Sequence, residues 1–357
     1  MVQCCKVGDT VNNTLDHNCP KCDAVLKFNS KEQNWKCEYC RSKFNLEDLN
    51  STKLSEDSNN IEIDVYTCNN CGAEIIADEN TSATSCIYCK NTAILKNKLE
   101  GIFNPDYLIP FKTTKEEAIQ AFKKLTKGKW LMPKAFNMKK NIKDISGIYV
   151  PFWIYDFDST GVIEAKCEKI STWTSRDYKY TKTDKYKSIR GGNISFQNIP
   201  VDGSKKFQND IMNSIEPYDY KDLKKFNYSY LSGFLSEKYD VNNEESKLEA
   251  NTRAKNSFIQ EMKKDMKGYD NVVITDNSIN LYNLKSSYVL LPVWILNIKY
   301  KDKFYMFAMN GQTGKIVGDI PIDIKKAIFI WIGLFTSIFI ILLLLNIILL
   351  IIARGIL

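Results

Sequence analysis

Histidine is almost absent from this 357-residue sequence, in which His17 is the single example. Residues 101–326 contain none, so we expect neither a histidine-dependent catalytic triad nor a histidine proton shuttle there. The sequence also lacks a GxxxxGK[ST] loop, which argues against a P-loop nucleotide site. The segment NGQTGK at 310–315 has only two residues between its glycines, and we interpret it as a hairpin turn.

The other candidates for catalysis are also few. RGGN at 190–193 is interpreted as a turn. Cys167 has charged and strand-forming neighbours and is interpreted as an ordinary thiol rather than a nucleophile. Five carboxylates of the same region could in principle form a site, although no partner pattern accompanies them and solvated or structural roles are expected. They are Asp156, Asp158, Glu216, Asp219 and Asp222.

An apolar signal-peptide segment is missing from the first ten residues, MVQCCKVGDT. We therefore expect a reducing compartment, in which cysteines bind metal rather than form disulfides. Eight of the eleven cysteines occur in CxxC pairs, which favours the same interpretation. Cys4, Cys5 and Cys167 are left over, and the first two are expected to lie in a disordered terminus.

The eight paired cysteines form a tandem repeat with the spacing CxxC-x14-CxxC, displaced by 49 positions. The predicted metal ligands are Cys19, Cys22, Cys37 and Cys40 in the first copy and Cys68, Cys71, Cys86 and Cys89 in the second. Four thiolates complete a tetrahedral Zn²⁺ shell without an open position, so two structural zinc ions are predicted. Iron in a rubredoxin-like site and redox-active CxxC pairs are the alternatives. Because the shell is already full, we interpret His17 as a linker residue rather than a ligand.

The charge of residues 1–100 bears on their partner. Eleven Lys and Arg stand against fifteen Asp and Glu, a net charge of −4, and two Zn(Cys)4 centres would take this to about −8. Nucleic-acid affinity depends largely on Lys and Arg that neutralise phosphates, so nucleic acid is not the expected partner. We expect protein contacts instead, with the acidic ribbons repelled outward from an anionic membrane.

Residues 101–326 carry a net charge of +10 and are predicted to form one α+β body with an antiparallel sheet. Helices are predicted from a capping box at Thr114 and Glu117 and from an apolar stripe that runs from Ala250 to Met266. The segments 147–157 and 288–298 share Pro-x-Trp-Ile, and each precedes an alternating strand. They predict two related hairpin units in one sheet.

The last predicted element is a membrane span. Residues 327–353 are uncharged, and as a helix they would be about 40 Å long against a hydrocarbon core of about 30 Å. Lys325, Lys326 and the basic body precede the span, so the positive-inside rule predicts a cytoplasmic N-terminal part and a tail-anchored, single-pass protein. The predicted fold is thus multi-domain: zinc ribbons at 1–50 and 51–100, an α+β body at 101–326 and one C-terminal transmembrane helix at 327–353.

Several ordered motifs resemble one family. They are CPKC…CEYC, CNNC…CIYC, YLIPF, GIYVPFWIYDF, IEPYDY, YLSGFLSEKYDV, VLLPVWILNIKY and NGQTGKIVGDIP, followed by the span. The chain resembles the TFIIB-type zinc-ribbon membrane proteins of low-GC Gram-positive bacteria, which are often labelled primosomal or helicase-related. The resemblance implies an association with phage-shock-A-like and SPFH or virion-core-like proteins, and hence a role in envelope maintenance.

Taken together, the sequence predicts a non-enzymatic, membrane-anchored zinc-ribbon adaptor that recruits a cytoplasmic protein partner to the bilayer. A membrane-tethered nucleic-acid-binding protein is the alternative. An enzyme that uses carboxylates of the body is the third hypothesis, and a polar pocket joining Asp156, Glu216 or Asp219 would favour it.

Overall fold

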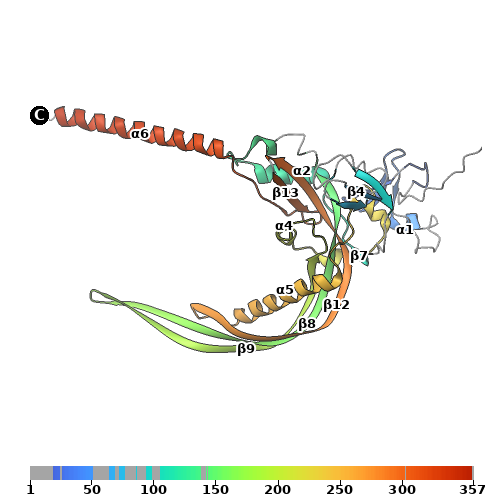
Figure 1. Ribbon diagram of the computed structural model, residues 1–357, viewed down its shortest axis with the longest axis horizontal. Coiled ribbons are helices and arrows are strands. Elements are labelled where there is room, and N and C mark those ends of the chain that lie inside the picture. The colour runs from blue at the N-terminus through green and yellow to red at the C-terminus, as the bar shows by residue number, and fades with distance from the viewer. Residues whose placement is uncertain are drawn as a thin grey trace, which may run out of the picture.

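The computed structural model describes residues 19–24, 26–50, 64–68, 72–76, 86, 94–98, 105–137, 142, 144–301 and 303–355. Figure 1 shows a central body from which two long elements extend, a curved β-structure and a C-terminal helix. The body is sheet-rich and mostly antiparallel, with helices packed against it, as the α+β prediction requires.

The first ribbon, residues 19–50, contains a small antiparallel sheet in the order β1-β2-β3. Its elements are β1 Leu26–Asn29, β2 Asn34–Cys37, β3 Lys43–Phe44 and the short helix α1 Leu46–Asn50. The second copy of the repeat contributes β4 Asp64–Cys68, β5 Glu74–Ile76 and β6 Ile94–Lys98. Unlike the first sheet, this one joins the body, because Ile76 of β5 pairs with Ser236 of β11 (Leu235–Ser236).

The body is organised around two 30-residue strands, β8 Ser146–Ser175 and β12 Asn271–Tyr300, which pair antiparallel. Strand β9 Tyr178–Asp202 extends β8 on its other edge, and β13 Lys303–Asn310 and β14 Ile316–Gly318 follow β12. The short strands β7 Tyr107–Leu108 and β10 Lys224–Lys225 complete the sheet. NGQTGK therefore joins β13 to β14, which confirms the predicted hairpin turn.

Both predicted helices form. Helix α2 Lys115–Thr126 has the predicted capping box and buries Ala118 and Phe122. Helix α5 Asn243–Lys264 buries Ala250, Ala254, Phe258 and Met262 along one face. Other helical elements that the structure describes in full in the body are short: η1 Lys134–Asn137, α4 Asn209–Ser214, η2 Tyr220–Asp222 and η3 Tyr228–Leu231.

The distal parts of β8, β9 and β12 form a curved extension that we call the arm, residues 157–196 and 271–282 (Figure 1). Helix α5 covers one face of the arm, where Phe258 and Met262 pack with Ile163, Ala165 and Cys167. The burial of Cys167 in this cluster agrees with its interpretation as an ordinary thiol.

The prediction that RGGN makes a turn is wrong, because Arg190–Asn193 lie inside strand β9. Here the glycines allow the backbones of neighbouring strands to approach each other closely. A Cβ added to Gly191 would lie 2.9 Å from the carbonyl oxygen of Gly161, and one added to Gly161 would lie 2.8 Å from that of Ser278. Of the two predicted hairpin units, the second forms, because 288–298 lies in β12, which pairs antiparallel with β13. The first does not, because 147–157 and the alternating segment 161–169 lie in one continuous strand, β8.

Helix α6 Ile324–Gly355 leaves the body at the segment 319–323. The backbone N–H of Asp323 donates a hydrogen bond to the carbonyl of Leu131 (2.8 Å), and Lys326 Nζ donates to the carbonyl of Met132 (2.6 Å). The first turn of α6 is therefore fastened to the loop between α2 and η1.

Candidate metal centre

The four cysteines of the first repeat come together. The sulfurs of Cys19, Cys22, Cys37 and Cys40 all lie within 4.8 Å of one another. Two of the separations are 3.4 Å, between Cys19 and Cys40, and 3.5 Å, between Cys22 and Cys37. Zinc–sulfur bonds of about 2.3 Å in a tetrahedron place sulfurs about 3.8 Å apart, so small movements would let this cluster enclose one ion. The chemistry of the donors therefore fits a metal bound by four thiolates.

Tight turns aim these sulfurs at one point. In the first turn, the N–H groups of Cys22 and Asp23 donate to the carbonyl of Cys19, and Asp23 has a φ of 60°. In the second, the N–H of Cys40 donates to the sulfur of Cys37 (3.4 Å), and Arg41 has a φ of 60°. A left-handed residue thus follows each CxxC pair, and strands β1 and β2 hold the two turns face to face.

Burial and charge differ among the four thiols. Cys19 and Cys37 are buried, Cys22 is partly buried, and Cys40 is exposed. The side-chain hydrogen bond with Ser42 (3.3 Å) lowers the pKa of the Cys40 thiol to about 6, whereas the pKa of the Cys22 thiol is raised to about 12. Metal binding requires deprotonated cysteines, so binding of an ion would release protons from this cluster.

The first ribbon packs directly on the body. Trp35 is only 1% exposed and lies against the rings of Phe28 and Tyr230, with centroid distances of 5.1 Å to each. Its indole N–H donates a hydrogen bond to the carbonyl of Ser229 (2.8 Å). The side-chain amide of Gln33 donates to the carbonyl of Phe111 (2.8 Å). Apolar burial and hydrogen bonds thus hold the first ribbon against a basic body, and the expected repulsion of the ribbons from an anionic membrane stays a prediction.

The second repeat reproduces the first turn of the first repeat. The N–H of Cys68 donates to Ala73 (2.8 Å) as that of Cys19 donates to Ala24 (2.7 Å), and Gly72 has a φ of 67° where Asp23 has 60°. Cys68 and Cys86 are both buried with Ala73. Cys71 and Cys89 lie outside the described residues, as do Cys4, Cys5 and His17. The second ion accordingly stays a prediction, and so do the domain boundaries.

The five candidate carboxylates have separate local partners. Asp156 accepts a hydrogen bond from the N–H of Asn198 (2.9 Å), and Asp158 accepts from Ser195 (2.6 Å). Glu216 forms an ion pair with Arg253 (2.9 Å), although burial still raises its pKa. Asp219 caps η2 through the N–H of Lys221 (3.1 Å), and Asp222 pairs with Lys112 (2.5 Å) and accepts from Gln312.

Two buried carboxylates near the base of the arm were not anticipated from the sequence. Glu237 is fully buried, pairs with Lys206 (2.9 Å) and accepts a hydrogen bond from Ser204 (3.1 Å). Burial raises the pKa of Asp202, and Glu237 adds to the shift. VDGSK and SEKYD carry these residues without any local pattern that marks them as buried, because a strand end and a loop bring them together only in the fold.

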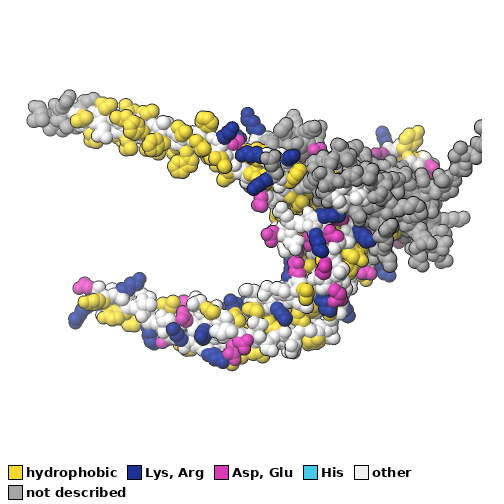
Figure 2. All heavy atoms as spheres, viewed as in Figure 1, with side chains coloured by type: hydrophobic (Ala, Val, Ile, Leu, Met, Phe, Trp, Pro, Cys, Tyr) yellow, Lys and Arg dark blue, Asp and Glu magenta, His cyan; other side chains and the backbone are white. Residues whose placement is uncertain are grey.

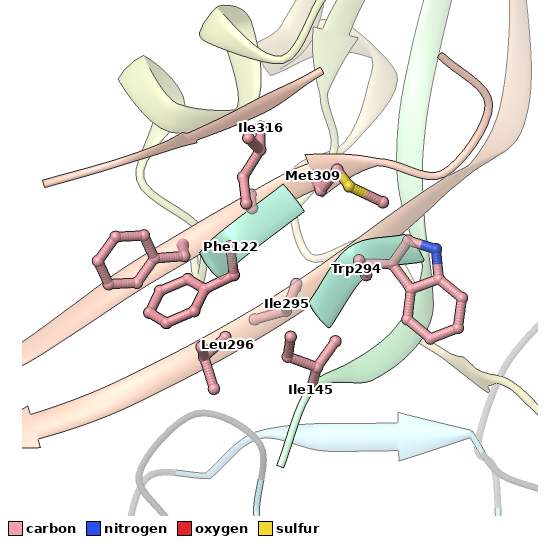
Figure 3. Close-up of a pocket in the computed structure, with 10 residues that line it drawn as sticks. Phe122, Ile145, Trp294, Ile295, Leu296, Met309 and Ile316 are labelled. Carbon is pink, nitrogen blue, oxygen red and sulfur yellow. The ribbon is translucent and has the colours of Figure 1, made fainter. Parts of the chain in front are cut away.

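The cavities described offer no catalytic constellation. A void of about 10 Å³ in the body core is lined by apolar side chains, among them Phe122, Ile295 and Ile316 (Figure 3). An open groove of about 470 Å³ between α5 and β12 is lined by Lys247, Asn251 and Lys255 and by residues 279–284 of β12. Neither is lined by any of the five candidate carboxylates.

The C-terminal helix has the properties of a span. Ile324–Leu350, 27 residues, is long and apolar enough to cross a membrane, and its most apolar window is not buried in the fold. Figure 2 shows hydrophobic side chains along α6 and Lys or Arg side chains where it meets the body. An exposed aromatic residue, Trp130, lies next to this junction and is 67% exposed.

A Bacillus subtilis (strain 168) protein named Uncharacterized protein YdjG is 35% identical to this chain over 312 residues. The match covers 87% of this chain and 92% of the Bacillus protein. No family model matches the chain, and no solved structure matches it. A similarity of this extent over nearly the whole of both chains shows common descent, and the chain belongs to the family of the Bacillus subtilis protein YdjG.

Proposed function

We propose that this protein is a non-enzymatic, membrane-anchored zinc-ribbon adaptor that holds a cytoplasmic partner at the bilayer. The observation that carries the proposal is the four-cysteine cluster of the first ribbon. Four thiolates leave a zinc ion no open position for water or substrate, so the ion is structural and its surroundings are free to serve as a binding surface.

The outer side of the first ribbon supplies that surface. Tyr39, between the two cysteines of the second pair, is 83% exposed although Trp35, four residues earlier, is buried against the body. Tyrosine is enriched among the residues that dominate protein–protein binding energy. The ribbon therefore has one face fixed to the body and another that presents an aromatic side chain on a metal-stiffened turn.

Membrane attachment is assigned to α6. The most apolar part of its 27-residue segment Ile324–Leu350 is not buried in the fold, and Lys325, Lys326 and Trp130 lie near its start. Lys and Arg favour the cytoplasmic side of a span, and aromatic residues favour the interface. We accordingly place the body in the cytoplasm. The resemblance to TFIIB-type zinc-ribbon membrane proteins supports a phage-shock-A-like or SPFH-like partner.

The decisive experiment measures binding of the full-length protein in nanodiscs to a purified phage-shock-A-like protein of the same genome. Tyr39→Ala should weaken binding at least tenfold, the loss of about 1.4 kcal/mol that an aromatic anchor can supply. Metal content should stay unchanged, because Tyr39 is not a ligand. The matched control is Tyr107→Ala, which truncates an exposed tyrosine of β7 in the body.

Two results would contradict the proposal. Equal binding by Tyr39→Ala and the unaltered protein would remove the ribbon turn from the interface. Salt-dependent binding of DNA or RNA that is lost in Tyr39→Ala would replace the protein partner with a nucleic acid.

A further inference from the structure

The arm ends in a two-stranded ribbon that extends past its supports. Strand β12 pairs with β8 only as far as Asn271 opposite Glu168, and α5 ends at Lys264. Beyond that point β8 and β9 continue alone to the turn at Arg176 and Asp177. We call residues 169–184 the tip. An isolated two-stranded hairpin is marginally stable in water, and no other segment among the described residues covers the tip.

Aromatic side chains gather on one face of the tip. Trp173 pairs with Tyr180 and Ser175 pairs with Tyr178, so these three aromatic residues share a face. The rings of Trp173 and Tyr180 are stacked, with centroids 5.6 Å apart and planes 12° apart. All three aromatic side chains are exposed: Trp173 by 49%, Tyr178 by 70% and Tyr180 by 45%.

The aromatic face continues the face that α5 covers nearer the body. Side chains alternate along a strand, so Trp173 lies on the same side of β8 as Ala165 and Cys167, which are buried under α5. Past the end of α5 this side of the sheet carries Trp173, Tyr178 and Tyr180 among polar residues, and no helix of the described residues covers it. The three rings are therefore the apolar part of a mixed face that is exposed.

Basic side chains lie on both faces of the tip, with Lys169 and Lys182 on the aromatic face and Lys179 on the other. The tip contains four Lys or Arg residues and two Asp, and one of the two acids, Asp184, is paired with Lys182 (3.0 Å). The four are Lys169, Arg176, Lys179 and Lys182. Trp and Tyr concentrate at membrane–water interfaces, and Lys and Arg are attracted to anionic headgroups.

The arm extends toward the same side of the body as α6 (Figures 1 and 2). A bilayer crossed by α6 therefore lies on the side toward which the tip points. The tip cannot enter the hydrocarbon, because its strands have unpaired backbone edges and charged side chains. Because the arm and α6 extend in nearly the same direction in Figure 1, contact between the tip and the headgroups requires the angle between α6 and the arm to change at residues 319–323.

We propose that the tip is a second membrane contact, in which Trp173, Tyr178 and Tyr180 enter the headgroup region of an anionic lipid surface and the Lys and Arg of the tip bind lipid phosphates. This contact rests on the assignment of α6 as a membrane span. It gives the protein two attachments to one bilayer, an apolar helix and a polar aromatic tip.

The test uses the full-length protein, one copy per nanodisc, with a lipid that carries a nitroxide near its headgroup. The emission of Trp173 is obtained by subtracting the spectrum of Trp173→Phe from that of the unaltered protein. In discs of phosphatidylglycerol and phosphatidylcholine we expect this emission to be blue-shifted and quenched. Lys179→Glu combined with Lys182→Glu should remove the quenching, whereas Lys224→Glu combined with Lys225→Glu on β10 should leave it unchanged.

Alkaline extraction of native membranes, done in parallel, separates the two proposals. Release of the protein would overturn both the span and the tip contact. An inserted protein whose Trp173 is not quenched would overturn the tip contact alone. Equal quenching in discs of pure phosphatidylcholine would overturn the anionic-lipid assignment. A blue shift that requires two copies per disc would show that a second copy of the chain covers the tip instead of lipid.

Discussion

The first ribbon and the tip of the arm are both antiparallel hairpins, yet they are stabilised in opposite ways. The strands β1 and β2 have four residues each, and their tryptophan, Trp35, is buried against the body in the same ribbon as the four clustered thiols. The strands of the arm have 30 and 25 residues, and their outermost tryptophan, Trp173, is exposed. The comparison shows that long strands do not by themselves bury the aromatic side chains of a hairpin. Burial depends on whether another part of the protein packs against the hairpin.

The largest effect should follow from loss of the metal. Cys37→Ser removes a buried ligand, so we expect the variant to lose about one ion per chain and much of its thermal stability, since metal affinity is part of the folding free energy of such modules. Elemental analysis and thermal unfolding in detergent measure both. Cys167→Ser is the matched control, a buried thiol outside the cluster whose replacement should leave metal content unchanged. Full metal content in Cys37→Ser would contradict the assignment of the centre.

A pair of tryptophan substitutions tests the comparison directly. Trp35→Ala should cost about 3–5 kcal/mol of unfolding free energy, because it leaves a cavity beside Phe28 and Tyr230. Trp173→Ala should change the unfolding free energy in detergent by about 0.5 kcal/mol or less, as at other exposed positions. Chemical denaturation of both variants provides the values. A larger loss at Trp173 than at Trp35 would reverse the comparison.

A smaller effect is expected at the base of the arm. Burial raises the pKa of Asp202, so the folded state retains a proton that the unfolded state releases above a pH of about 4. Stability therefore falls as pH rises from there toward the folded pKa. Asp202→Asn keeps the oxygen that accepts from the N–H of Ser204 and removes this dependence. The variant should be more stable than the unaltered protein at pH 7, with the difference vanishing below about pH 4 in denaturation measured across pH.

The smallest effect concerns the ion pair between Lys31 of the ribbon and Glu117 of α2 (2.5 Å). Both side chains are largely exposed, so Lys31→Ala should cost about 0–1 kcal/mol and less at high salt. Denaturation at low and high ionic strength measures this. A greater loss would mean that charge, rather than the burial of Trp35, fixes the ribbon to the body.

Local patterns in the sequence predicted local structure well. Thr114 and Glu117 form the expected capping box because both partners lie within one helical turn. The stripe from Ala250 to Met262 is buried because helical periodicity determines which residues share a face. The four thiols of the first repeat meet because their spacing already encodes two turns and a hairpin.

Long-range arrangements were not accessible in this way. Gly191 and Gly192 were interpreted as a turn, since the sequence does not show that three strands approach so closely there. The packing of the first ribbon on the body was not predicted, because net charge says nothing of the pocket formed by Phe28, Tyr230 and the carbonyl of Ser229 that receives Trp35. Both features depend on contacts between residues distant in the chain.

The fastening of α6 to the loop at Leu131 and Met132 has a mechanical consequence. A span joined through a loose linker would let the body rotate freely, whereas these two hydrogen bonds restrict the angle between helix and body. A change in bilayer thickness that alters the tilt of the span would then reorient the body. A tip in contact with lipid would limit this change in orientation. The thickness of the bilayer would thereby influence the orientation in which Tyr39 is presented to a partner.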